Sequence, residues 1–204
     1  MQQKEIIKEK IRERYGKIAL TGKNNNNDNS DCCFMPVDWY DNDGNSDISS
    51  LQFTKLIGYH CKDLDSIPQV AILSVGCGAP IDFANIQSRE TIVDLGSGAG
   101  IDILLSANRL GKLCKVIGID ITDEMLEKAR RNTKDNGHIN AEFRKRDIEK
   151  RITIEDNTVD IVISNCVNNL TRDKVSTFNE INRILDQMVD AAKYQLAGRR
   201  NMQL

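Results

Sequence analysis

No apolar run in the 204-residue sequence is long enough to cross a bilayer. The opening residues, MQQKEIIKEK, also lack the apolar core of a signal peptide. Charge is nearly balanced, at a formal net value of −2, so electrostatics favours neither nucleic acid nor an anionic membrane as a partner. We therefore predict a cytoplasmic protein with no nucleic-acid or membrane partner.

Zinc-binding spacings are lacking as well, because the cysteines form no C-x-x-C pair and no cluster with histidine. In the cytosol thiols stay reduced, so we expect no disulfide framework. Histidine is scarce, and neither His60 nor His138 is a plausible catalytic residue. The six cysteines are the unusual feature of the composition, and each must first be considered as a small core residue: Cys32, Cys33, Cys61, Cys77, Cys114 and Cys166.

The amino-terminal part reads as a helix followed by polar sequence. Residues 3–20 place their apolar side chains on one helical stripe. Residues 24–30 and 38–50 are polar and turn-rich, which predicts loops or disorder. A short helix is expected to begin near Pro68 and to end at Gly76.

From residue 91 the pattern alternates between strand and helix. Strands are predicted at 91–95, 115–120, 141–148 and 159–164, and helices at 101–110, 123–137 and from about 173 onward. This order predicts an α/β, Rossmann-like fold with a parallel sheet, flanking helices and an amino-terminal helical segment. We divide the chain into residues 1–65, the helix with the flexible polar segment, and residues 66–204, the sheet domain.

The sharpest motif is the run DLGSGAG at 94–100, between a predicted strand and a helix. Glycines there permit a tight turn and let backbone N–H groups approach a ligand. Asp120 ends the next predicted strand, where a carboxylate can accept hydrogen bonds from two ribose hydroxyls. Both features fall on the carboxyl edge of the sheet, where open parallel sheets bind their ligands.

A dinucleotide site is the competing interpretation of this loop. The spacing is G-x-G-x-G, and Ile101 stands where the dinucleotide pattern has Gly or Ala. Asp94 would repel a pyrophosphate but would hold the ammonium of a methionine moiety. The charge therefore favours a sulfonium cofactor, S-adenosylmethionine, while a glycine turn without function remains a third interpretation.

Three further segments carry a resemblance to a known family. They are RERYGKIA near the start, GCGAP at 76–80 and SNCVNNLTRDK at 164–174. With these in order around the glycine loop, the chain resembles the arsenite methyltransferases, a family of class I S-adenosylmethionine-dependent methyltransferases. The resemblance implies methylation of arsenite or its thiol conjugates, and a thiol reductant such as glutathione or thioredoxin as a partner.

The resemblance also assigns residues. It implies that Cys77 and Cys166 bind arsenic and that Cys32 or Cys33 assists, which gives Cys77, Cys166 and Cys33 as catalytic residues. The implied cofactor contacts are Asp94, Gly96, Ser97, Gly98, Gly100, Asp120, Ile121, Ile148, Glu149 and Asn165. Soft trivalent arsenic prefers thiolates, and its own lone pair attacks the methyl group, so no general base is needed.

The sequence departs from the family in two places. Asn168 stands where the family has isoleucine. After Leu185 an apolar helical period continues through Leu196, whereas the family turns into a fifth strand, so we expect the last helix to continue. The strand at 159–164 would then be an unpaired edge, which predicts marginal stability or a homodimer through that edge.

A later family cysteine is also absent, which suggests a chain truncated at its carboxyl terminus. Two thiolates and a small thiol such as glutathione can still complete a trigonal arsenic site. Two alternatives remain open. One is a methyltransferase for a small carbon, nitrogen or oxygen nucleophile, and the other is a non-catalytic metalloid-binding or degenerate protein.

Overall fold

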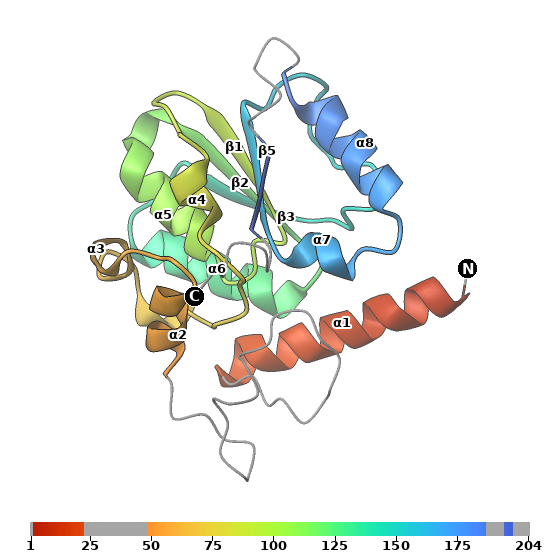
Figure 1. The fold of residues 1–204 in the computed structure, drawn as a ribbon, viewed down its shortest axis with the longest axis horizontal. Helices are drawn as coiled ribbons and strands as arrows, with labels where there is room; N and C mark the ends of the chain where they lie inside the picture. The colour runs from red at the N-terminus through yellow and green to blue at the C-terminus, as the bar shows by residue number, and fades with distance from the viewer. Residues whose placement is uncertain (1, 23–48, 187–193, 198–204) are drawn as a thin grey trace.

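A single parallel sheet organises the protein in the computed structural model, which describes residues 2–22, 49–186 and 194–197 (Figure 1). Its strands are β1 (Thr91–Leu95), β2 (Lys115–Asp120), β3 (Ala141–Lys145), β4 (Ile161–Asn165) and β5 (Tyr194–Ala197). They lie in the order β3-β2-β1-β4-β5 and all neighbours pair in parallel. The order in which strands are added to the sheet reverses between β1 and β4, the point where such sheets bind ligands.

The predicted Rossmann-like sheet is thus confirmed, with β1 and β2 at the predicted residues. Continuous apolar runs form these strands because both faces of the sheet are covered. Successive residues such as Ile92 and Val93 enter opposite layers of the core. The strand expected at 159–164 begins two residues later, and Val159 instead forms an isolated bridge to Leu185.

Helices cover both faces of the sheet. On one face α5 (Ile101–Leu110) and α6 (Asp123–Asp135) contribute Ile103 and Leu126 to a cluster with the strands. On the other, α8 (Lys174–Ile184) contributes Ile181 and Ile184. The expected stop of α6 at Gly137 is borne out, since that glycine has φ +74°.

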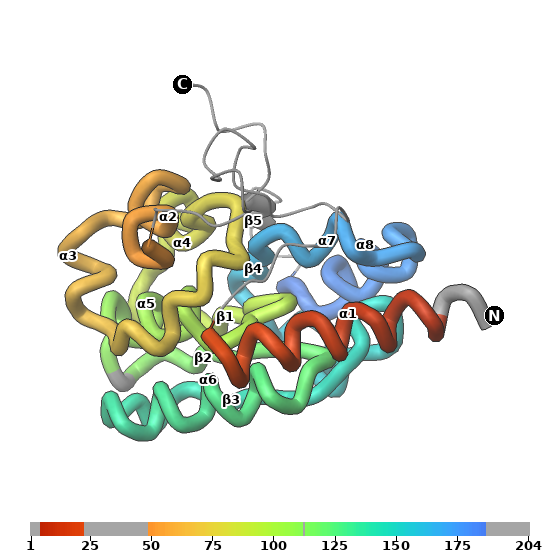
Figure 2. The backbone as a smooth tube through the Cα atoms, turned by 90° about the horizontal axis from the view of Figure 1, so that it is seen from below, coloured from red at the N-terminus to blue at the C-terminus, as the bar shows by residue number. Residues whose placement is uncertain are grey.

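Residues before 66 share the core of the sheet domain. The helix α1 (Gln2–Thr21) matches the prediction at 3–20 and lies beside α6 (Figure 2). The helix α2 (Ser50–Leu56) begins at a capping box, in which Ser49 and Gln52 bond reciprocally. Its Phe53 packs with Leu104 of α5. The division at residue 65 stays a prediction, and loops expected between 23 and 48 lie outside the described residues.

The remaining helices of the described chain are short. They are α3 (Cys61–Leu64), α4 (Pro80–Phe83) and α7 (Val167–Leu170), with 3-10 turns η2 (Gln69–Ala71) and η3 (Gly111–Leu113). The helix predicted from Pro68 to Gly76 is wrong, because the chain becomes extended at Ile72 and turns at Ser74 with φ +56°. In the part of the chain that the structure describes, no helix is both long and apolar enough to span a membrane.

The carboxyl-terminal prediction is also wrong. Helix α8 ends at Ile184 instead of continuing, because Leu185 is extended and the N–H of Asp186 bonds to Val159 in sheet fashion. The later segment β5 then pairs in parallel with β4, from Val162 opposite Tyr194 onward. The apolar residues from Val175 to Leu196, which predicted one continuous helix, therefore lie partly in α8 and partly in β5. Since β4 is paired on both sides, the argument for a homodimer through an exposed β4 edge is lost.

Candidate active site

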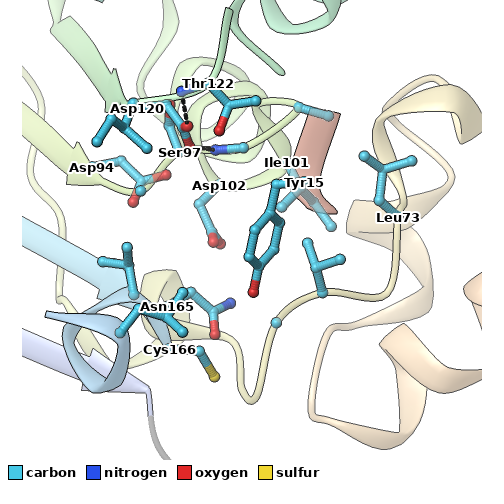
Figure 3. A pocket seen from close by; sticks show the side chains of 18 of the residues that line it. Tyr15, Leu73, Asp94, Ser97, Ile101, Asp102, Asp120, Thr122, Asn165 and Cys166 are labelled. Atoms are coloured by element: carbon cyan, nitrogen blue, oxygen red, sulfur yellow. Dashed lines mark hydrogen bonds between the residues drawn. The ribbon is translucent and has the colours of Figure 1, made fainter. Parts of the chain in front are cut away.

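A cleft opens at the carboxyl edge of the sheet, over the switch point between β1 and β4 (Figure 3). It holds about 1150 Å³, its open mouth included. Asp94 from β1, Asp102 from α5 and Tyr15 from α1 converge on it. The lining is mainly apolar with several carboxylates, a composition suited to a small cationic or amphipathic ligand.

The glycine loop after β1 is held against the end of β2. The N–H groups of Gly96 and Ser97 both donate to the carbonyl of Ile119, at 2.7 and 3.0 Å. The Asp120 carboxylate accepts from the N–H of Gly98 at 3.0 Å and from the N–H of Thr122 at 2.8 Å. These bonds place the loop and Asp120 side by side on the cleft wall, as predicted from the sequence.

Asp94 is the least satisfied carboxylate in the cleft. Its side chain is 2% exposed, and Oδ1 has no hydrogen-bond partner within the described residues. Burial raises the pKa of Asp94 well above its ordinary value, and the charges of Asp102 and Asp120 raise it further. The Ser97 hydroxyl is likewise buried without a partner there. Such orphaned acceptors indicate a site that a polar, positively charged ligand completes.

The structure brings nearly all predicted cofactor residues to this cleft. Its lining includes Asp94, Gly96, Ser97, Gly98, Asp120, Ile121, Ile148, Glu149 and Asn165. Gly100 is the exception, because it starts α5 with φ +88° and lies against Ala129 of α6. The lack of a side chain at Gly100 therefore lets α5 pack closely against α6. Asn168, the departure from the family pattern, is buried but is not among the lining residues.

The two predicted arsenic ligands meet at the wall of the cleft. Cys77 and Cys166 are 89 residues apart in sequence, yet their Cα atoms are 5.9 Å apart and their sulfur atoms are bonded as a disulfide. The fold thus brings the two sulfur atoms together, and the reduced state expected in the cytosol stays a prediction. Cys166 lines the cleft, whereas Cys77 is not among the lining residues. Cys33, the third predicted residue, lies outside the described residues.

Among residues 2–22, 49–186 and 194–197, no group of three or more His, Cys, Asp or Glu side chains is arranged to hold a metal ion. The cysteine pair therefore offers two candidate ligands within the described chain. The remaining cysteines are separate from it: Cys61 is exposed and Cys114 is buried, both as free thiols. Cys114 therefore fits the small core residue considered for each cysteine, whereas Cys61 does not.

Sequence reasoning missed the contribution of α1 to the site. Lys8, Ile11 and Tyr15 all line the cleft from this helix. The Nζ atom of Lys8 lies 2.6 Å from Oδ2 of Asp147 and 2.9 Å from Oε2 of Glu149. The apolar stripe of α1 predicted that it packs on something, but a pairing across 139 residues leaves no local signal.

Replacing Lys8 by methionine should loosen α1 from the cleft. The variant keeps most of the apolar stem but leaves the poorly exposed Glu149 without its cation and Asp147 with only the more distant Lys150. We expect the free energy of unfolding to fall by about 1–2 kcal/mol. Denaturant unfolding measures this, with Lys10→Met, at an exposed lysine of the same helix, as the control. Equal stability of the two variants would contradict the role given to Lys8.

Comparison with known proteins identifies the class. A family model described as a methyltransferase domain matches residues 86–190, about half of the chain, and the chain belongs to this family. Among curated relatives, an arsenite methyltransferase from Halobacterium salinarum is 39% identical over 183 residues, covering 89% of this chain and 45% of that protein. An arsenite methyltransferase from Aquipseudomonas alcaligenes is 36% identical over 126 residues, covering 58% and 35%.

Among solved structures, an arsenic (III) S-adenosylmethionine methyltransferase from Chlamydomonas reinhardtii is 30% identical. The match covers 67% of this chain and 45% of that one, with a TM-score of 0.48. The chain thus spans less than half the length of each of these three relatives.

Proposed function

We propose that this chain binds S-adenosylmethionine in the cleft and methylates trivalent arsenic held by Cys77 and Cys166. The observation that carries the proposal is the meeting of these two cysteines at the wall of an acidic, glycine-loop cleft. An arsenite methyltransferase that is similar to it over 89% of its length supports the choice of substrate.

The residues present fit the cofactor. Asp94 offers a buried carboxylate oxygen without a partner, which suits the ammonium of the methionine moiety. Asp120 stands where a carboxylate accepts from ribose hydroxyls, and Ile121 and Ile148 supply apolar surface for a base. When bound, S-adenosylmethionine supplies an electrophilic methyl group on a positively charged sulfur.

The two cysteines act as ligands once they are reduced. Opening the Cys77–Cys166 disulfide takes two electrons, which two molecules of glutathione or one of thioredoxin provide as they are oxidised to a disulfide. Thiolates then hold the soft metalloid. The arsenic lone pair would form the new arsenic–carbon bond, and the electrons of the broken carbon–sulfur bond would stay on the sulfur of the donor. The residues of this chain position the metalloid and exclude water, and no base is required.

A third sulfur completes a trigonal site. Within the described chain only two thiols are brought together, so the third ligand is a small thiol such as glutathione, or Cys33 from the segment outside the described residues. Arsenite then enters as a thiol conjugate and exchanges two of its thiols, which leave, for Cys77 and Cys166.

Methylation itself is the test of this function. The purified chain, mixed with arsenite, glutathione and S-adenosylmethionine, should yield methylated arsenic detectable by mass spectrometry. A folded chain that binds the cofactor but yields no product would favour the non-catalytic alternative. Turnover of another small nucleophile that survives Cys→Ser at both positions would favour a different methyltransferase.

Cofactor binding should depend on pH. Burial raises the pKa of Asp102 to about 7, with a further contribution from Asp82 opposed by Arg109, Tyr59 and Asn165. The raised pKa of Asp94 adds to the effect in the same direction. A cationic ligand favours both ionised carboxylates, so the complex binds fewer protons than the free protein.

We therefore expect the affinity for S-adenosylmethionine to rise with pH through neutrality and to fall below about pH 7 as the carboxyls take up protons. Calorimetry in two buffers of different ionisation enthalpy should detect proton release on binding. An affinity that is flat between about pH 6 and about pH 8, with no proton release, would contradict this prediction.

A further inference from the structure

A buried chain of hydrogen bonds joins α5 to the turn that carries Cys77. The Tyr59 hydroxyl lies 2.9 and 3.0 Å from the two carboxylate oxygens of Asp102 and donates its proton to that group. The Asn165 Nδ2 donates to the Tyr59 hydroxyl oxygen at 3.0 Å and to the carbonyl of Gly78 at 2.8 Å. The Asn165 Oδ1 accepts from the N–H of Cys77 at 2.8 Å.

Asn165 is therefore connected to both cysteines. It precedes Cys166 in the chain, and its side-chain amide holds the N–H of Cys77. The turn lies directly on this amide, because a Cβ added at Gly76 would come within 2.6 Å of Nδ2 of Asn165. A change in the orientation of the Asn165 amide must move the Cys77 turn relative to Cys166.

Tyr59 and Asp102 in turn fix the orientation of that amide. The two residues are 4% and 2% exposed, so water is a poor replacement for a lost partner there. The Tyr59 proton goes to Asp102, which leaves its oxygen lone pairs facing Nδ2 of Asn165. Burial and the charge of Asp102 raise the pKa of Tyr59 well above its ordinary value, which keeps the hydroxyl protonated.

We propose that Tyr59 and Asp102 are positioning residues for the arsenic site, acting through Asn165 to keep the Cys77 turn against Cys166. The proposal rests on the function proposed above. Neither residue touches the metalloid. Their effect is to set how readily two sulfur atoms from distant segments act together on one atom.

The first test separates arsenic affinity from cofactor affinity. Tyr59→Phe keeps the ring volume and removes the hydroxyl, so we expect the Kd of the reduced full chain for arsenite to rise about tenfold, or about 1.4 kcal/mol. The Kd for S-adenosylmethionine should rise less, by about threefold at most, through the higher pKa of Asp102; calorimetry measures both constants. Thr133→Val removes another buried, hydrogen-bonded hydroxyl, on α6, and should change neither value. Equal loss of both affinities, or only a lower Tm, overturns the proposal.

A second measurement works without arsenic. In buffers of reduced and oxidised glutathione, the equilibrium constant for forming the Cys77–Cys166 disulfide reports how well the two thiols are placed. We expect Tyr59→Phe and Asp102→Leu to lower this constant about tenfold. Asp102→Asn retains an acceptor for the Tyr59 hydroxyl and should lower it less than about threefold.

The arsenite affinity and the disulfide equilibrium test the proposed function and the positioning role independently. If the wild-type chain binds no arsenite, the proposed function is wrong, and the disulfide equilibrium still decides the positioning role. If all variants share the wild-type disulfide equilibrium, the positioning proposal is wrong whatever the chain binds.

Discussion

Gly96→Ala should weaken S-adenosylmethionine binding by at least about 100-fold, close to 2.7 kcal/mol. Gly96 has φ +76°, and an added Cβ would lie 2.5 Å from Cβ of Val167. Neither atom is at the flexible end of a side chain, so the glycine loop or α7 must shift. The glycine loop forms part of the cleft wall proposed to bind the cofactor, and α7 directly follows Cys166. A shift of either one therefore damages the site. Calorimetry with the cofactor measures the loss.

Gly137→Ala is the matched control for this variant. Gly137 has nearly the same backbone conformation, φ +74°, but nothing lies within 4 Å of an added Cβ. It should therefore cost only the backbone strain of about 1–2 kcal/mol and leave the cofactor affinity unchanged. If both variants bind the cofactor like the wild type, close contact between the glycine loop and α7 is not required for the site.

Cys166→Ser should lower kcat/KM for arsenite by at least about 1000-fold, near 4 kcal/mol. Cys166 is buried and lines the cleft, and the hard hydroxyl of serine is a poor ligand for a soft metalloid. The Kd for S-adenosylmethionine should change little, because the loop of 94–100 and Asp120 are not altered. Turnover of arsenite with saturating cofactor and glutathione measures the effect.

Cys61→Ser provides the comparison, since Cys61 is an exposed free thiol away from the cleft. It should match the wild type in turnover. Cys77→Ser should resemble Cys166→Ser, because both sulfurs are required to hold one arsenic atom. A Cys166→Ser variant that retains wild-type turnover would remove the cysteine pair from the mechanism.

The sheet and the cofactor loop were predictable because their signals are local. An apolar five-residue run followed by glycines defines β1 and its turn, and Asp120 ends β2 in the same way. Strand order places both at one edge, so their proximity follows from topology alone. The meeting of Cys77 and Cys166 had no such local signal and entered only through resemblance to a family.

Other parts of the site depend on contacts between distant residues. Nothing near Tyr59 indicates that it bonds to Asp102, although a carboxylate in an otherwise apolar stretch of α5 is itself an unusual feature. The end of α8 was missed because an apolar helical period does not report where sheet hydrogen bonds replace helical ones. The N–H of Asp186 bonds to the carbonyl of Val159, two residues before β4, instead of continuing the helix.

The most direct test of the account is the environment of arsenic bound to the reduced chain. X-ray absorption at the arsenic edge, with glutathione and the demethylated cofactor product present, should show one arsenic per chain surrounded by sulfur alone. In the Cys77→Ser, Cys166→Ser double variant this signal should be lost while the cofactor product still binds. Oxygen-bound arsenic in the wild type, or the same sulfur signal in the double variant, would contradict the account.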